Sequence, residues 1–410
     1  MAETAHLAAA LSTGERVMTG PTRVVFVNSG ILGQSTFAKF VREAMAFESD
    51  LDSSHINLSG DLTPAERLVR RALCGRVWPD HWLGLTNIDF GRYRAEYHAG
   101  LQAGRRMRRL FRAGRPDVLH FHRQATAYAS ISLMRRVPSL VSIDCTQDIV
   151  VDAAASRLER WTYQPNIRAE SRIFEAAAAV ISTSQWAADC LRRSYPSCRA
   201  PIHVMPTAVR LQFFSESWLD ERRQRATSGL RPRVLFVGGD FWRKGGPDLV
   251  AAWRAGDFAQ LADLEIVTDD PRAPEDVRGV RVLRGVASYS TEWVDAWRRA
   301  DVFVLPTRQD AFGLVFQEAA AAGLPRIGTR TNAVPEMITD GVSGLLVAPG
   351  DREGLVRALR TLIESPDLRQ RFGRAARDQV LRDAHPDDYR RRLAGIIRDA
   401  AHRPAVRRVA

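Results

Sequence analysis

The chain has 410 residues, more than one hydrophobic core supports, so we expect two domains of roughly 200 residues each. Its 45% hydrophobic and 26% charged residues are ordinary for a globular protein, and no apolar run reaches the roughly 18 residues that span a bilayer. The four cysteines show neither metal-ligand spacing nor a disulfide framework, which is typical of a reducing cytoplasm. We therefore predict a cytoplasmic protein with a flexible tail, and no secretory signal, over residues 1–20.

In the first half, strand-like and helix-like segments alternate, which predicts a parallel sheet covered by helices. The first strand, 22–30, leads into a loop with Gly30 and Gly33 and then a helix from Ser35 to Met45. The expected further strands are 117–121, 139–143, 178–182 and 202–205, with helices near 92–113, 166–176 and 185–195. We predict one Rossmann-like domain over 21–206.

The second half begins after a polar stretch with several Gly and Pro residues, 206–232, which we interpret as a linker. The segment 233–239 then starts a second doubly wound unit. Its further strands are expected at 264–270, 280–286, 301–307 and 325–330. We predict a second Rossmann-like domain over 207–385 and a terminal helix over 386–410 that crosses back to the first domain. The fold class is α/β, with two domains facing a central cleft at the carboxyl ends of their strands.

The segment 301–350 is the most informative part of the chain. An apolar strand is followed by an acidic loop and a helix that begins near Phe312-Gly313 and ends at Gly323. Asp310 precedes this helix and Glu318 lies about a turn and a half inside it. A helix N-terminus favours a phosphate or a sugar hydroxyl, because its N–H groups lack partners within the helix and its dipole is positive there.

This segment resembles the donor-site signature of retaining nucleotide-sugar glycosyltransferases of the GT-B fold, family 4. The matching positions are Asp310, Phe312, Gly313, Leu314, Glu318, Ala319 to Ala322, Gly323 and Pro325. Asp310 departs from the signature, where glutamate is usual. The resemblance extends from about residue 22 to about residue 385, densely after 233 and thinly before it.

A second motif follows the strand 233–239. Its glycines allow close backbone approach, and Arg243 and Lys244 supply positive charge for a diphosphate. By resemblance Lys244 contacts the donor diphosphate. The family's usual arginine is replaced by Gly239, so Arg243 is a candidate to supply that charge. An ordinary strand–helix turn with exposed cations is the alternative interpretation.

In the first domain the resemblance points to His122 at the end of a central strand, where relatives place a histidine near the donor sugar. A core or surface imidazole is the alternative interpretation. His120, on the other face of that strand, is expected to pack inside. Gly33 is a candidate for close approach of acceptor or diphosphate, or else a plain turn glycine. Asp144 stands where relatives often carry histidine, and Thr207-Ala208 replaces a usual Asn-Gly.

The resemblance implies transfer of a sugar from a nucleotide-diphosphate donor, with retention of configuration and without a metal or cofactor. Lys244, Arg243 and the amides around Phe312, Gly313 and Leu314 would stabilise the leaving diphosphate. Asp310 would bind sugar hydroxyls and Glu318 the ribose. A helix N-cap and a solvated first-turn acid are the respective alternatives. The acceptor is expected to be a glycan or a lipid-linked molecule, in cell-surface polysaccharide or glycolipid synthesis.

Two other functions stay open. A sugar-nucleotide epimerase or phosphorylase can use the same scaffold. The net charge of +12 also permits a nucleic-acid binder, although no recognised nucleic-acid motif is present.

The positive charge indicates an acidic partner, and its arginines form three clusters. These are Arg67, Arg70, Arg71 and Arg76; Arg105, Arg106, Arg108, Arg109 and Arg112; and Arg390, Arg391, Arg392, Arg403, Arg407 and Arg408. The first is next to Trp78 and Trp82, a mixture typical of interfacial helices. Contact with the inner face of an anionic membrane and simple solvation are equal alternatives for this cluster.

Overall fold

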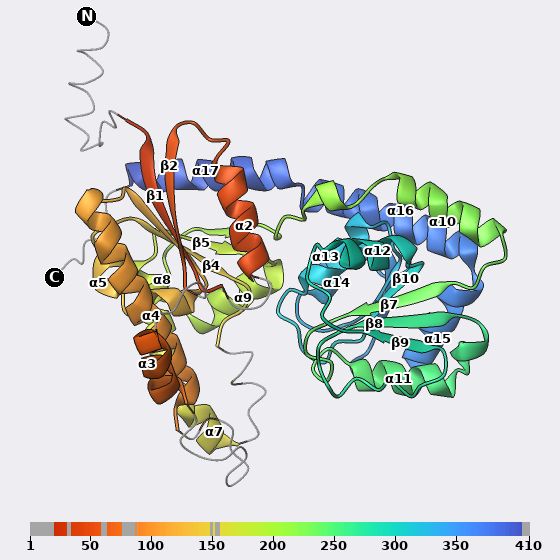
Figure 1. The fold of residues 1–410 in the computed structure, drawn as a ribbon. Helices are drawn as coiled ribbons and strands as arrows, with labels where there is room; N and C mark the ends of the chain where they lie inside the picture. Colours follow the sequence, from red (N-terminus) through yellow and green to blue (C-terminus); the bar gives the residue numbers. More distant parts are fainter. Residues whose placement is uncertain are drawn as a thin grey trace, which may run out of the picture. The chain divides into compact units, whose positions relative to one another are not determined.

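The computed structural model describes residues 20–30, 34–58, 64–75, 87, 89–147, 151 and 156–403. It forms two compact units, shown in Figure 1. The N-terminal unit comprises residues 1–205 together with 387–410, and the C-terminal unit comprises 206–386. The sequence assigned Gly33, Arg76, Trp78, Trp82, Arg407 and Arg408 to sites or clusters, and all six lie outside the described residues.

The N-terminal unit is built on a six-stranded parallel sheet with the order β2-β1-β3-β4-β5-β6. The strands are β1 (Thr22–Asn28), β2 (Leu51–Asn57), β3 (Val118–His122), β4 (Ser139–Ile143), β5 (Ala179–Ser182) and β6 (Ile202–Val204). Strands β4 and β5 are buried along their whole length because helices cover both faces of the sheet (Figure 1). Both strands were expected, at 139–143 and 178–182.

The helices of this unit are α2 (Gln34–Met45), α3 (Pro64–Cys74), α4 (Gly91–Leu110), α5 (Ile131–Met134), α7 (Arg157–Thr162), α8 (Gln164–Ala176), α9 (Gln185–Ser194) and α17 (Pro386–His402). The last of them joins the unit after the chain has passed through the other unit. Its Arg398 forms ion pairs with Glu48 (2.6 Å) and Asp50 (2.7 Å), and the ring of Tyr389 packs against Phe37 with centroids 5.5 Å apart.

The C-terminal unit has a second six-stranded parallel sheet with the order β12-β11-β10-β7-β8-β9. Its strands are β7 (Arg233–Val237), β8 (Asp263–Val267), β9 (Val280–Leu283), β10 (Val302–Leu305), β11 (Arg326–Thr329) and β12 (Gly344–Val347). Its helices are α10 (Ser217–Thr227), α11 (Gly246–Ala255), α12 (Thr291–Arg299), α13 (Leu314–Ala321), α14 (Val334–Met337), α15 (Arg352–Glu364) and α16 (Pro366–Asp383).

The predicted linker at 206–232 is wrong as a description of this segment. It contains α10, which belongs to the C-terminal unit. The buried guanidinium of Arg222 donates hydrogen bonds to the carbonyls of Trp297 (2.9 Å), Ala300 (2.7 Å) and Ala322 (2.5 Å). These carbonyls lie at the ends of α12 and α13 and lack helical partners, so one arginine satisfies three of them. Burial lowers the pKa of Arg222 to about 9.

Candidate functional site

The C-terminal sheet reverses its strand order between β7 and β10. The chain runs from β7 outward through β8 and β9, and then returns to the other side of β7 as β10. Parallel sheets bind ligands at the carboxyl ends of the strands that flank such a reversal. The loops that follow these two strands, 238–245 and 306–313, carry both of the sequence motifs. The fold therefore brings the two motifs to one edge of the sheet.

The two loops are held closely together. Gly245 has φ +79°, and a Cβ atom at this position would lie 1.9 Å from the carbonyl oxygen of Pro306. Only glycine permits this backbone approach. The amide of Arg308 donates to the carbonyl of Arg243 at 3.0 Å. The glycine in the first motif is thus explained by its contact with the second loop.

Lys244 and Asp310 connect the loops through an ion pair. Their side chains are only 13% and 10% exposed, so solvent screens the pair little. Helix α13 has Gly313 at its N-cap, in the left-handed region and without a capping side chain. Asp310 is therefore not the N-cap that the alternative interpretation required. The sequence placed Lys244 and Asp310 in one site, but it did not indicate that they bind each other.

Arg243 directs its guanidinium into the same loops. It donates to the carbonyl of Gln309 at 2.8 Å and forms an ion pair with Asp240 at 3.3 Å. A Cβ atom at Gly239 would meet nothing within 4 Å, so space for a side chain is open where the family's arginine is missing. Arg243 thus stabilises the loop structure in addition to any part it has in binding.

Glu318 is buried in α13, which excludes the solvated first-turn acid as its interpretation. Its Oε1 accepts a hydrogen bond from the hydroxyl of Tyr289 at 2.8 Å. Burial raises the pKa of Glu318 to about 7, and the bond from Tyr289 opposes this rise. Nearby in the sequence, Phe312 is also buried and Leu314 is half-buried.

Tyr289 and Arg210 are neighbours of the site that the sequence did not reveal. Tyr289 has φ +65°, which is rare for a residue with a side chain and persists only where the surroundings hold it. Its ring lies 4.8 Å from that of Phe213, and the guanidinium of Arg210 stacks over both rings at 5.1 and 5.5 Å. A tyrosine in a serine-rich turn carries no pattern that predicts this role.

In the N-terminal sheet the strand order reverses between β1 and β3, and His122 is the last residue of β3. Its ring centroid lies 4.7 Å from that of Phe37 in α2, and its Nδ1 has no hydrogen-bond partner among the described residues. Burial lowers the pKa of His122 to about 4, so the imidazole is neutral at pH 7. His120 is buried, as expected, and its Nε2 lies 2.6 Å from Ser142 Oγ.

A buried acidic group in this unit was also missed. Glu170 accepts hydrogen bonds from Gln124 Nε2 (2.8 Å), Tyr195 OH (2.6 Å) and the amide of Gln147 (3.1 Å). Burial raises the pKa of Glu170 to about 7. Its position inside an ordinary amphipathic helix offered no signal, because the partners come from three other segments.

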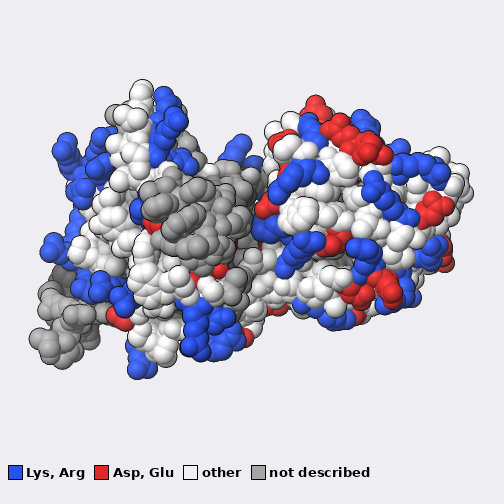
Figure 2. All heavy atoms as spheres, turned by 90° about the horizontal axis from the view of Figure 1, so that it is seen from below, with Lys and Arg blue, Asp and Glu red and all other residues white. Residues whose placement is uncertain are grey.

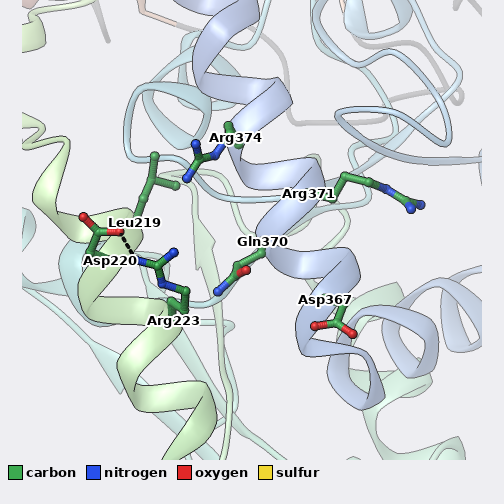
Figure 3. Close-up of a pocket in the computed structure, with 7 residues that line it drawn as sticks. All are labelled: Leu219, Asp220, Arg223, Asp367, Gln370, Arg371 and Arg374. Carbon is green, nitrogen blue, oxygen red and sulfur yellow. Dashed lines mark hydrogen bonds and ion pairs between the residues drawn. The ribbon is translucent and has the colours of Figure 1, made fainter.

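Other parts of the described chain add no competing site. Its His, Cys, Asp and Glu residues form no group of three that could hold a metal ion. The carboxylate of Asp270 forms an ion pair with Arg272 (2.5 Å) and accepts a hydrogen bond from the amide of Phe241 (2.9 Å). A cavity of about 240 Å³ lies between α10 and α16 (Figure 3), and none of the predicted site residues lines it. None of the described helices is long and apolar enough to cross a membrane.

Known proteins match most of the chain. The family model of glycosyl transferases group 1 matches residues 231–365, and that of glycosyltransferase family 4 matches residues 69–213. Glycogen synthase of Mycobacterium tuberculosis is 30% identical over 302 residues, which cover 70% of each chain. D-inositol 3-phosphate glycosyltransferase of Paenarthrobacter aurescens is 29% identical over 64% of this chain and 68% of the relative.

Solved structures agree in fold. Sucrose-phosphate synthase of Thermosynechococcus elongatus superposes with a TM-score of 0.70 and 19% identity, covering 92% of this chain and 98% of that one. Anabaena HepE, in complex with UDP and glucose, has a TM-score of 0.63 and 15% identity, covering 92% and 100%. The sheet topology and the similarity to these families and solved structures together define a glycosyltransferase of the GT-B fold. The chain belongs to the glycosyltransferase family that carries these group 1 and family 4 domains.

Proposed function

We propose that the protein is a retaining, family 4 hexosyltransferase that moves a sugar from a nucleotide-diphosphate donor to a glycan or lipid-linked acceptor. The observation that carries this proposal is the arrangement at the reversal between β7 and β10. There the loops bearing Lys244 and Asp310 are bonded to each other, and α13, which bears Glu318, starts at the second loop. Structural neighbours in complex with UDP and with UDP-glucose support a donor of this class.

The roles follow from charge. Cleavage at the anomeric carbon leaves negative charge on the diphosphate and positive charge on the sugar. Lys244 and the N-terminal amides of α13 would stabilise the diphosphate. Asp310 would bind sugar hydroxyls, and the same carboxylate holds Lys244 in place before the donor arrives. Glu318 would accept hydrogen bonds from the ribose, with Arg243, Phe312, Gly313 and Leu314 contributing to donor binding.

The N-terminal unit would supply His122 and the loop of Gly33. A neutral imidazole with an unpartnered nitrogen suits hydrogen bonding to a sugar hydroxyl rather than proton transfer near pH 7. Binding requires no metal or organic cofactor in this proposal. We place the enzyme in the cytoplasm, in cell-surface polysaccharide or glycolipid synthesis.

Thermal unfolding in the presence of a panel of nucleotide sugars tests the donor. A true donor at 100 times its Kd stabilises the fold by about 2.7 kcal/mol. Nucleoside diphosphate should then be released only when an acceptor is added, and the anomeric configuration of the product should match that of the donor. An epimerase would instead convert the donor without an acceptor. No stabilisation by any nucleotide sugar would contradict the proposal.

Replacing Tyr289 with phenylalanine tests the environment of Glu318. The lost hydroxyl leaves a buried carboxylate with one hydrogen bond fewer, which should cost about 1–3 kcal/mol of folding stability when Glu318 is ionised. Because the bond from Tyr289 lowers the pKa of Glu318, that pKa should rise in the variant. Donor affinity, titrated against pH by calorimetry, should therefore reach its half-maximal value at higher pH. An unchanged pH profile would argue against this contact.

A further inference from the structure

Helix α3 exposes its apolar side. Leu68, Val69 and Leu73 share one side of the helix and are 69%, 41% and 45% exposed. Arg67, Arg70 and Arg71 occupy the opposite side of α3 and are exposed as well. An amphipathic helix of a globular protein normally buries its apolar side against the core. In α3 that side is instead available to a partner.

The short helix α7 lies at the same end of α4 as the end of α3 (Figure 1). Arg94, in the first turn of α4, donates to the carbonyl of Leu73 at 2.8 Å. Phe90, just before α4, packs against Trp161 of α7 with ring centroids 5.4 Å apart. In α7, Leu158 and Trp161 are 51% and 57% exposed. We define the α3–α7 face as Leu68, Val69, Leu73, Leu158 and Trp161, with the exposed arginines Arg67, Arg70, Arg71, Arg157 and Arg160.

The positive charge of the protein is concentrated in the unit that carries this face. The N-terminal unit contains 33 Lys and Arg against 22 Asp and Glu, a balance of +11. The C-terminal unit contains 26 against 25, a balance of +1. Figure 2 shows the difference on one face, where Lys and Arg dominate the N-terminal unit and both signs mix on the C-terminal unit.

We propose that the α3–α7 face binds the surface of an anionic lipid bilayer. Leucines and a tryptophan beside arginines are the chemistry of interfacial helices, which insert apolar side chains while the cations attract lipid phosphates. A second copy of the chain would bring the same five arginines against each other, which like-charge repulsion opposes. Nucleic acid would attract the arginines but leaves the exposed leucines unexplained. This contact goes beyond sugar transfer and does not depend on the donor site.

Flotation of the full chain with lipid vesicles tests the proposal. We expect binding to vesicles of phosphatidylcholine mixed with phosphatidylglycerol, weak binding to phosphatidylcholine alone, and loss of binding at high salt. The apolar variant Leu68→Ser/Leu73→Ser should lose binding. The charge variant Arg67→Gln/Arg70→Gln/Arg71→Gln should weaken it about 100-fold, since each arginine near such a surface contributes roughly fivefold.

Two matched controls lie in the C-terminal unit, where the exposed apolar residue Leu230 and the exposed arginines Arg254, Arg281 and Arg374 are located. Leu230→Ser and Arg254→Gln/Arg281→Gln/Arg374→Gln should leave vesicle binding unchanged. All variants should keep the unfolding temperature and the nucleoside diphosphate release measured with a water-soluble acceptor. This separates failure of the membrane proposal from failure of the proposed transfer reaction.

Three outcomes would overturn the proposal. The first is equal binding to neutral and anionic vesicles, and the second is undiminished binding of the two α3 variants. The third is no vesicle binding, and tight, salt-dependent binding to duplex DNA or self-association in sedimentation would then identify another occupant. In that case the α3–α7 face serves nucleic acid or a second copy of the chain.

Discussion

Replacing Lys244 with methionine is expected to lower kcat/KM for sugar transfer by about 100- to 1,000-fold, because a cation that faces the developing diphosphate charge is removed. Methionine keeps most of the lysine stem, which packs near Gly238. Donor affinity should fall as well. Steady-state kinetics and calorimetric titration with the donor selected by the thermal-shift panel measure both effects.

The same substitution should also destabilise the fold, since Asp310 is left as an unpaired, nearly buried carboxylate. Breaking one partner of a buried pair costs about 3 kcal/mol. The double variant Lys244→Met/Asp310→Asn removes that uncompensated charge and should regain most of the stability, but not the activity. Recovery of activity together with stability would mean that Lys244 acts only through the loop structure. Arg308→Ala, which removes an exposed cation paired with Asp248 at 2.9 Å, is the control in the same loops.

Replacing Glu318 with glutamine should stabilise the protein above neutral pH while weakening donor binding. Burial raises the pKa of Glu318 from 4.5 in the unfolded chain to about 7 in the folded protein. The folded state therefore binds the proton more tightly. The stability that protonated Glu318 contributes to folding is complete below pH 4.5 and is lost as the pH rises through 7. Each pKa unit corresponds to about 1.4 kcal/mol of folding stability. The wild type therefore loses on the order of 3 kcal/mol over this pH range, whereas the stability of the variant does not change.

Chemical unfolding at pH 5 and pH 8 measures this difference, which should be large only at pH 8. Glu170→Gln is the matched control, because burial raises the pKa of Glu170 to about 7 as well, but in the N-terminal unit. It should remove the pH dependence of stability that Glu170 contributes in the same pH range and leave donor affinity unchanged. Equal donor affinity in the Glu318→Gln variant and the wild type would contradict a role of Glu318 in donor binding.

The strands with continuous apolar runs were predictable, since burial on both faces of a parallel sheet leaves a simple pattern. Two other strands were missed. The edge strand β2 has the sequence LDSSHIN, where only Leu51 and Ile56 are buried, and β12 has four residues in a loop-rich segment. Helix α10 was interpreted as a linker because its composition is polar. Its attachment depends on Arg222, and a buried arginine is the opposite of what a hydrophobic pattern indicates.

The candidate site was predictable where a motif fixes spacing along the chain. Strand, acidic loop and helix appear between 302 and 321 in the predicted order, and Gly323 follows with φ +70° as the expected terminator. The contacts across the sheet were not predictable. The pair of Lys244 with Asp310 joins residues 66 positions apart, and Tyr289 reaches Glu318 from a turn with no motif. Sequence spacing describes one segment at a time, whereas these bonds join segments brought together by the fold.

The N-terminal unit is completed by a helix that is made after the whole C-terminal unit. Residues 205–385 separate β6 from α17, which buries Leu393 and Ile397 and holds Glu48 and Asp50 through its arginines. During synthesis on the ribosome the C-terminal unit therefore has all its strands and helices before the N-terminal unit has all of its own. The first half of the chain must wait, with the surface for α17 uncovered, until the C-terminal unit and α17 have been synthesised, and it depends most on chaperones in that interval.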